Sequence, residues 1–300
     1  MSIVRHNRPH FFKFATTEAA LKIIEGRSLK WSSATAFNDP FDHQAGFSLE
    51  LEESQFAKLL TDSMLRVIFS DAPVSVGASV RFTQMLLVLR QMQDRLQKDQ
   101  ISKELYDAAL EVARNLREGI SEFNAAIHAH LLHSRVLCVT EGANNVVMWS
   151  HYADQHRGVA FQLGCIESLD NRLLAAKRVE YTDKFIAFPS STEYAQHLTG
   201  EKPIDMAALV WKIAYTKHVD WAYEREWRVH VPLLNERPED DFSIYTEPAE
   251  VFQAMYIGCR MPQEQASLLV SAARRVLPNM ALFRAIRAND SFSLRFVPFE

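Results

Sequence analysis

A long stretch of helix-type sequence interrupts a chain whose other segments have the composition of strands. Between Leu51 and Leu132, apolar side chains recur at steps of three and four residues, the pattern of one buried helix face. The clearest part of this stripe is Leu105, Ala109, Val112, Leu116, Ile120, Phe123, Ile127 and Leu131. Strand-type segments lie on both sides of it without a regular strand–helix alternation, which favours α+β over a doubly wound fold. The sequence therefore predicts an α+β protein in which residues 51–132 form a helical insertion.

Aromatic and β-branched residues mark the expected strands outside the insertion, because such side chains suit a pleated, half-buried surface. The clearest candidates are residues 11–14, 135–140, 158–163, 226–231 and 254–258. No internal repeat and no low-complexity linker divides the chain. We therefore expect a single domain over residues 1–300, with a mixed or antiparallel sheet as its core.

Composition excludes several classes of protein. Among the 300 residues, 48% are hydrophobic and the formal net charge is only −4, so the chain is not of the disordered class. This nearly balanced charge also argues against a broad nucleic-acid-binding surface. No apolar stretch reaches the roughly 18 residues of a membrane span, and the N-terminus has no signal-peptide core. Three scattered cysteines, Cys138, Cys165 and Cys259, are typical of reduced thiols. We expect a cytoplasmic protein without a membrane partner.

Two polar segments follow expected strands. The first begins at Trp31 and Ser32 and ends in Phe37-Asn38-Asp39-Pro40-Phe41-Asp42, which has the composition of a turn. Its Asn and Asp side chains either satisfy backbone donors of that turn or form the polar floor of a pocket. The second segment runs from Met148 to Gly158 and concentrates Trp, His, Tyr and Arg side chains. Its composition exceeds what a simple surface helix requires.

A pair of acidic residues marks a third segment. On an extended strand, Glu224, Glu226 and Arg228 share one face, and the two carboxylates lie about 7 Å apart. The neighbouring Arg would depress the pKa of one carboxyl while the other could be raised, which is an arrangement used in acid–base chemistry. The alternative is an edge strand with cross-strand ion pairs.

Taken in order, these motifs resemble those of an uncharacterised bacterial family of unknown function. The resemblance rests on Phe12-Lys13-Phe14, on residues 37–42, on residues 148–153 with Gly158, and on Lys217-x-x-x-Trp221-x-x-Glu224-x-Glu226-Trp227-Arg228. It covers nearly the whole chain apart from the insertion. The family implies no established activity.

A more distant resemblance is to ADP-ribosyltransferases, enzymes that cleave NAD at its nicotinamide bond. That family has a basic residue on its first strand, a Ser-rich strand end after an aromatic residue, and a late Glu-x-Glu; this sequence has Lys13, Trp31-Ser32-Ser33 and Glu224-Arg225-Glu226 in that order. The resemblance implies a split-sheet core, NAD as substrate, Glu226 as the catalytic carboxylate, and Glu224 as the group that positions or deprotonates the acceptor. The candidate NAD-binding residues are Lys13, Trp31, Ser32, Asn38, Asp39, His151, Tyr152 and Arg228.

We therefore hypothesise an NAD-dependent transfer of ADP-ribose to a macromolecule or a small molecule, in a bacterial toxin or phage-defence setting. In this reaction, Lys13 would neutralise the pyrophosphate of NAD, and Trp31 or Tyr152 would stack on its nicotinamide ring. The sequence has no Cys-x-x-Cys pair and no His-Glu-x-x-His motif, so this hypothesis includes no metal site.

Two other classes of function stay open. One is a hydrolase or nuclease that uses Asp39, Asp42, His151 and Glu226, with Mg²⁺ as a candidate ion. The other is a non-catalytic sensor or interaction module, with the helical insertion as its partner surface.

Overall fold

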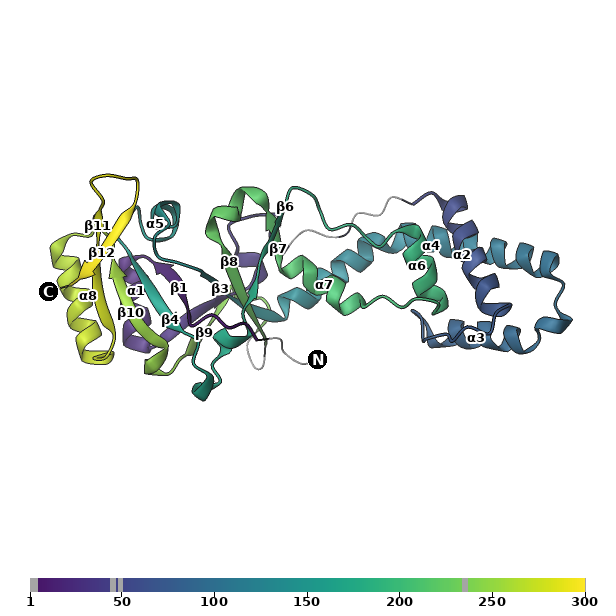
Figure 1. Ribbon diagram of the computed structural model, residues 1–300, viewed down its shortest axis with the longest axis horizontal. Helices are drawn as coiled ribbons and strands as arrows, with labels where there is room; N and C mark the ends of the chain where they lie inside the picture. The colour runs from purple at the N-terminus through teal and green to yellow at the C-terminus, as the bar shows by residue number, and fades with distance from the viewer. Residues whose placement is uncertain (1–4, 44–46, 48–50, 234–236, 300) are drawn as a thin grey trace. The chain divides into compact units, whose positions relative to one another are not determined.

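The computed structural model describes residues 5–43, 47, 51–233 and 237–299, which form two compact units (Figure 1). The first unit comprises residues 1–44, 130–183 and 215–300, and the second comprises residues 45–129 and 184–214. The first unit contains the strands and the second is helical, so the α+β class is confirmed. The second unit includes residues 184–214 in addition to most of the expected insertion.

A ten-stranded, mostly antiparallel sheet forms the first unit. Its strands follow the order β12-β11-β10-β4-β1-β3-β2-β9, while β8 pairs with β3 and with β5. Only the β10–β11 pair of this sheet is parallel among the described residues. The strands are β1 (His10–Ala15), β2 (Ser28–Ser32), β3 (Ser134–Thr140), β4 (Val159–Gly164), β5 (Lys177–Arg178), β8 (Glu226–Pro232), β9 (Phe242–Thr246), β10 (Phe252–Ile257), β11 (Ala281–Arg287) and β12 (Leu294–Pro298). Two short strands, β6 (Glu180–Thr182) and β7 (Thr216–His218), form a separate parallel pair.

The sheet opens along one edge of β3. Strand β1 pairs with β3 at Phe12↔Thr140, and β2 pairs with the same strand at Ser32↔Val136. Strand β1 then continues along β4, and β2 continues along β9. The edge of β3 near Cys138 therefore faces the space between two diverging strands.

Helices α1 (Thr17–Gly26), α5 (Val146–Tyr152) and α8 (Gln263–Val276) belong to the first unit. Helix α1 begins where the Thr16 side chain accepts from the Ala19 N–H, and it ends at Arg27 in the left-handed conformation. Helices α1 and α8 contribute to one core with the sheet, in which Phe11, Ile24 and Leu269 are fully buried. Short 3₁₀ turns complete the unit: η1 (Ala34–Ala36), η3 (Glu167–Leu169), η4 (Arg172–Ala175), η5 (Val219–Glu224) and η6 (Ala249–Val251).

The second unit has a core of its own. It is built from α2 (Glu53–Ile68), α3 (Val80–Gln91), the turn η2 (Gln93–Arg95), α4 (Lys98–Leu132) up to residue 129, α6 (Ser191–Thr199) and α7 (Met206–Ala214). Leu60 of α2, Ala109 of α4 and Ala195 of α6 are buried in it. The helical interpretation of residues 51–132 is confirmed.

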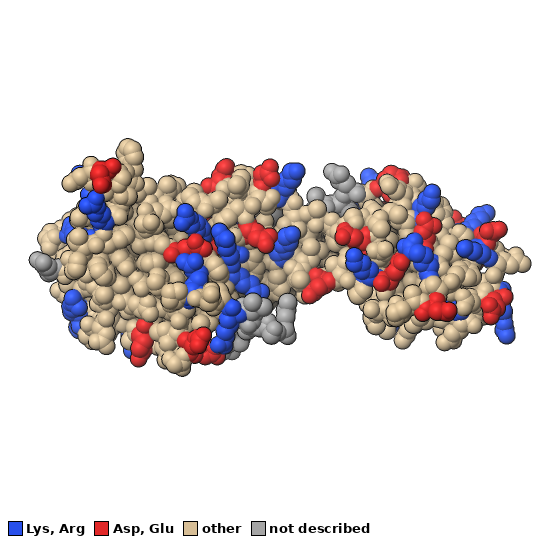
Figure 2. Space-filling view, viewed as in Figure 1, with Lys and Arg blue, Asp and Glu red and all other residues tan. Residues whose placement is uncertain are grey.

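Charges of both signs alternate over the face of the protein shown in Figure 2. No helix among the described residues is long and apolar enough to cross a membrane.

Candidate functional site

A cavity of about 430 Å³ lies in the first unit where β1 and β2 leave the edge of β3. Its walls come from these three strands, from the segment after β2, from α5 and from the chain between β7 and β8. The lining residues are Phe12, Lys13, Phe14, Ser32, Ala36, Phe37, Asn38, Val136, Cys138, Val139, Thr140, Met148, His151, Tyr152, Lys217, Glu224 and Glu226.

The strand ladder directs the main chain of Cys138 toward this cavity. Cys138 lies opposite Arg228 of β8, two residues after Glu226. The Glu226 N–H donates to the Tyr181 hydroxyl, and the Glu226 C=O accepts from the Val179 N–H, so both groups point away from β3. Because hydrogen-bonding direction alternates along an antiparallel strand, the Cys138 peptide groups point away from β8 and toward the gap. The Cys138 carbonyl accepts there from the Lys13 ammonium at 2.9 Å. Lys13 is thereby held at the floor of the cavity.

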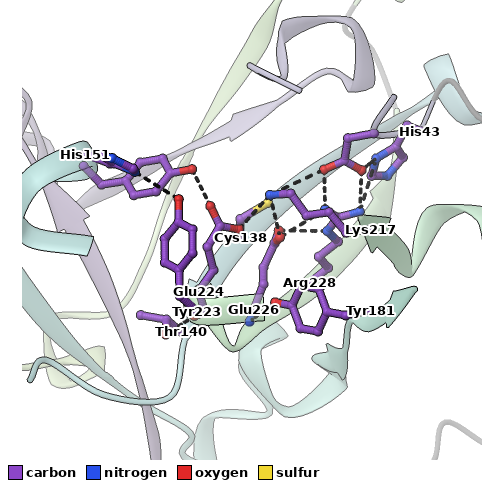
Figure 3. Close-up of polar contacts among 12 residues, drawn as sticks. His43, Cys138, Thr140, His151, Tyr181, Lys217, Tyr223, Glu224, Glu226 and Arg228 are labelled. Atoms are coloured by element: carbon purple, nitrogen blue, oxygen red, sulfur yellow. Dashed lines mark hydrogen bonds and ion pairs between the residues drawn. The ribbon is translucent and has the colours of Figure 1, made fainter. Parts of the chain in front are cut away.

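Lys217 joins the carboxylates of the cavity wall (Figure 3). Its buried ammonium donates to Glu224 at 2.6 Å and to Glu226 at 3.2 Å, and lies 3.8 Å from a carboxylate oxygen of Asp42. Two glutamates from one short segment thus converge on a cation from β7.

A second buried cation, Arg228, contacts two of the same carboxylates. The Arg228 side chain is completely buried, and its guanidinium donates to Glu226 and to Asp42, each at 2.8 Å. Charge-assisted contacts of this kind are needed because an unpaired buried charge would be very costly. Asp42 also contacts the ring of buried His43 at 2.8 Å. The cluster therefore alternates cations and carboxylates from the cavity wall into the interior.

The two glutamates differ in proton affinity. Burial acts to raise the pKa of Glu226, but Arg228 and Lys217 outweigh it and lower that pKa to about 2. Burial and the negative charge of Glu226 raise the pKa of Glu224 above its ordinary value, against the opposing effect of Lys217. Glu226 therefore stays ionised at neutral pH, and Glu224 is the glutamate with the higher proton affinity.

Helix α5 supplies the side chains on the other side of Glu224. The Tyr152 hydroxyl donates to the second Glu224 oxygen at 2.5 Å, and His151 lies 2.9 Å from the Tyr223 hydroxyl. Asn145 caps α5 by accepting two N–H groups and also donates to the Tyr223 carbonyl. Burial and Glu224 raise the pKa of Tyr152, so this hydroxyl stays a donor. The cap therefore fastens α5 to the segment that carries Glu224.

A change of backbone conformation brings the glutamates together. Glu224 ends the turn η5, Arg225 has a left-handed φ of 44°, and Glu226 begins β8. The expectation that both glutamates lie on one face of a continuous strand is therefore wrong. They meet because the chain turns at Arg225, which points both carboxylates at Lys217.

Residues 148–229 match the model of a family described as a protein of unknown function (DUF2971). No curated protein and no solved structure gives a significant match. The matched segment contains α5 from residue 148 onward together with Lys217, Glu224, Glu226 and Arg228, so it carries most of the charged cluster. The predicted resemblance to an uncharacterised family is supported over this segment.

Most of the residues singled out in the sequence line one cavity. Those that the structure brings together are Lys13, Ser32, Asn38, His151, Tyr152, Glu224 and Glu226. Arg228 is not a lining residue; its guanidinium contacts two residues of the wall, Glu226 and the ring of Phe37.

Two of the singled-out residues lie elsewhere. Trp31 is completely enclosed in the core, where its ring packs against Tyr245, and it therefore has no face to offer a ligand. Asp39 accepts from the Phe41 N–H at 2.9 Å, as an Asx-turn does. Asp39 therefore satisfies a backbone donor of its own turn, which was one of the two alternatives for this segment. Trp31 does not lie in the site.

Lys217 and Asp42 are the principal site residues to which the sequence assigned no role in NAD chemistry. In the sequence, Lys217 is only the first position of the motif that ends at Arg228. The strand β6, which pairs with β7, is three residues long. The sequence shows no signal that Asp42 and Arg228, far apart in the chain, form a pair.

The residues of the metal-dependent alternative have other partners. Arg228 and Lys217 already neutralise Asp42 and Glu226, and their positive charges would repel a metal ion there. His151 contacts Tyr223, and Asp39 bonds within its own turn. Within residues 5–43, 47, 51–233 and 237–299, no group of three or more His, Cys, Asp and Glu side chains is placed to hold a metal ion.

Proposed function

We propose that the protein is an enzyme resembling the ADP-ribosyltransferases, which cleaves the nicotinamide–ribose bond of NAD in the cavity of the first unit. The observation that carries the proposal is the convergence of Glu224 and Glu226, with opposite pKa shifts, on the wall of a cavity between diverging strands. Groups of different proton affinity at one centre are a recurrent arrangement for catalysis.

Glu226 has the charge that bond cleavage requires. As nicotinamide leaves, positive charge develops on the ribose, and a fixed carboxylate stabilises an oxocarbenium-like centre. Lys217 and Arg228 keep Glu226 ionised and hold it in one orientation. The proposed role of Glu226 is therefore electrostatic.

Glu224 has the proton affinity that the acceptor step requires. The acceptor forms a bond to the ribose C1 atom while the bond to nicotinamide breaks, and the proton that the acceptor loses passes to the Glu224 carboxylate. The Tyr152 hydroxyl and the Lys217 ammonium hold the two oxygens of Glu224 in place. Glu224 is the proposed general base.

The other walls offer contacts for the rest of NAD. Lys13 presents a positive charge from β1, on which the negative pyrophosphate can be placed. Ser32 and Asn38 add polar groups, and the rings of His151 and Tyr152 border the cavity. The proposed setting, a bacterial toxin or phage-defence effector, rests on the resemblance, and the proposed cytoplasmic location rests on the composition of the sequence.

The test is NAD turnover by the full chain, followed by chromatography of nicotinamide release and by transfer of labelled ADP-ribose. Glu226→Gln is expected to lower turnover by about 10²–10³-fold, the range seen when a single group that stabilises a transition state is lost. Glu18→Gln, on the exposed surface of α1, is the matched control and should turn over NAD like the wild type. Equal turnover by the wild type and Glu226→Gln, or no turnover by the wild type, would reject the proposal.

A further inference from the structure

A thiol and an imidazole meet at the ends of β10 and α5, outside the lining of the cavity. Cys259 follows β10 and is half-buried. Its Sγ atom lies 4.0 Å from Nδ1 of His156, which follows α5. A cysteine beside an imidazole is the usual arrangement of an activated thiol.

The contacts of Ser150 favour the tautomer of neutral His156 that carries its proton on Nε2. The Ser150 hydroxyl donates its hydrogen to the Val146 carbonyl at 3.0 Å, and its oxygen lies 3.3 Å from His156 Nε2. Because the hydroxyl has one hydrogen, its contact with the ring is made by accepting from Nε2–H. In the neutral imidazole, Nδ1 is then the bare nitrogen, and it faces the Cys259 thiol.

The backbone holds this pair in position. The Gly258 N–H donates to the Gly158 carbonyl at 2.9 Å, and the Arg260 N–H donates to the His156 carbonyl at 3.0 Å, so Cys259 lies between two fixed peptides. A Cβ atom at Gly258 would come within 2.1 Å of the His156 carbonyl oxygen, so only glycine permits this approach. The ring of Trp149 stacks on the imidazole with an interplanar angle of 10°.

The three cysteines have different surroundings although all are half-buried. Burial and the carboxylate of Glu226 raise the pKa of Cys138 well above its ordinary value. Burial raises the pKa of Cys165 to about 11. Burial and Arg260 lower the pKa of His156, which keeps its ring neutral at neutral pH. Only Cys259, among these thiols, has an imidazole contact of this kind in the part of the chain that the structure describes.

We propose that Cys259 is the reactive thiol of this protein and a site of S-thiolation by small disulfides of the glutathione type, with His156 as its base. His156 Nδ1 takes the thiol proton, and the Cys259 thiolate attacks one sulfur of the disulfide. The disulfide S–S bond breaks as the mixed disulfide forms, and the departing thiolate receives the proton from His156. None of these residues lines the cavity, so this chemistry is independent of the proposed transfer reaction.

The test is incubation of the full, reduced chain with glutathione disulfide, followed by intact mass and peptide mapping over time. We expect the first adduct on Cys259, its loss in Cys259→Ser, and wild-type labelling in Cys138→Ser and Cys165→Ser. His156→Gln should slow the labelling of Cys259 by at least about tenfold, because the base is removed. First labelling at Cys138 or Cys165, or no adduct, overturns the proposal.

A structural effect of the His156 change is separated by two further measurements. Ser150→Ala leaves both reacting groups in place but frees the imidazole proton, and it should slow Cys259 labelling less than His156→Gln does. In urea, where no fold remains, the three thiols should react at equal rates in every variant that contains them. Unchanged labelling of folded His156→Gln would overturn the role of the base.

Discussion

The ammonium of Lys217 and the carboxylate of Glu224 lie 2.6 Å apart, although they come from β7 and from the end of η5. The same ammonium reaches Glu226 at 3.2 Å, while Glu226 alone of the two glutamates also contacts Arg228. Glu226 therefore contacts two cations, Lys217 and Arg228, whereas Glu224 contacts Lys217, which it shares with Glu226. This difference in partners, added to burial, explains why the pKa of Glu226 is lowered and that of Glu224 is raised.

Removal of Lys217 is expected to destabilise the protein strongly. In Lys217→Met, Glu224 loses its cation, and Asp42 and Glu226 keep Arg228; breaking a buried ion pair from one side costs about 3–5 kcal/mol. Urea denaturation measures the loss. Lys22→Met, which removes an exposed partner of Glu18, is the control and should leave the midpoint unchanged. Similar midpoints for the two variants would show that the buried cluster is not stabilised by Lys217.

Stability at acid pH should depend on Glu226. Its pKa falls from an ordinary value of 4.5 to about 2 in the fold, so the unfolded chain binds the proton more tightly. The contribution is complete above pH 4.5 and is lost as the pH falls toward 2; it amounts to about 3 kcal/mol. Asp42, whose pKa the charge of Arg228 also lowers despite burial, acts in the same direction.

Unfolding free energies between pH 2 and pH 6 check this prediction. Glu226→Gln cannot ionise, so its stability should fall less steeply with acid than that of the wild type. Glu18→Gln is again the exposed control. Parallel curves for the wild type and Glu226→Gln would contradict the lowered pKa.

The fold class and the helical stretch were predictable because they depend on patterns within short windows of sequence. The stripe that includes Leu105 and Ala109 is one such pattern, and both residues are buried as it requires. Trp31 shows the limit: alternation on a strand separates two faces but does not say which face borders a cavity. Its ring points into the core.

The charged cluster was only partly predictable. The sequence indicated Glu224 and Glu226 as a pair. Their approach to Lys217 depends on the left-handed conformation of Arg225, which no local sequence pattern predicts. The contact between Asp42 and Arg228 joins a turn after β2 to strand β8, segments that are far apart in the chain. These contacts belong to the tertiary structure and not to any motif.

The proposed base predicts a particular dependence of NAD turnover on pH. Glu224 must lose its proton to act, and burial next to Glu226 raises its pKa, so kcat/KM should increase with pH through a value above 4.5. Glu224→Gln should remove this acid limb together with most of the activity. Tyr181→Phe, whose hydroxyl contacts the Glu226 backbone, is the control that should retain the limb. An unchanged acid limb in Glu224→Gln would assign the titration to another group.

Trp31 and Tyr152 should respond in opposite ways to substitution by Phe. Trp31→Phe leaves a void in the core and should cost about 1–3 kcal/mol of stability, with NAD binding unchanged. Tyr152→Phe removes the hydroxyl that holds Glu224 and should lower turnover with a smaller effect on stability. Denaturation measures stability, calorimetric titration measures NAD binding, and nicotinamide release measures turnover in both variants. Weaker NAD binding by a folded Trp31→Phe variant would place Trp31 in the site after all.

The separate cores predict that the two units respond separately to a core mutation. Leu60 is 1% exposed in the helical unit, and Leu60→Ala should cost that unit about 2–5 kcal/mol. Phe161 of β4 is buried in a different core cluster, that of the sheet unit. Hydrogen exchange should therefore accelerate in α2 and α6 and stay slow in β4. Lys58→Ala, at an exposed position two residues away, should change neither region. Equal acceleration in β4 and α2 would show instead that the two cores unfold as one, because a cooperative unit loses protection throughout when any part of its core is weakened.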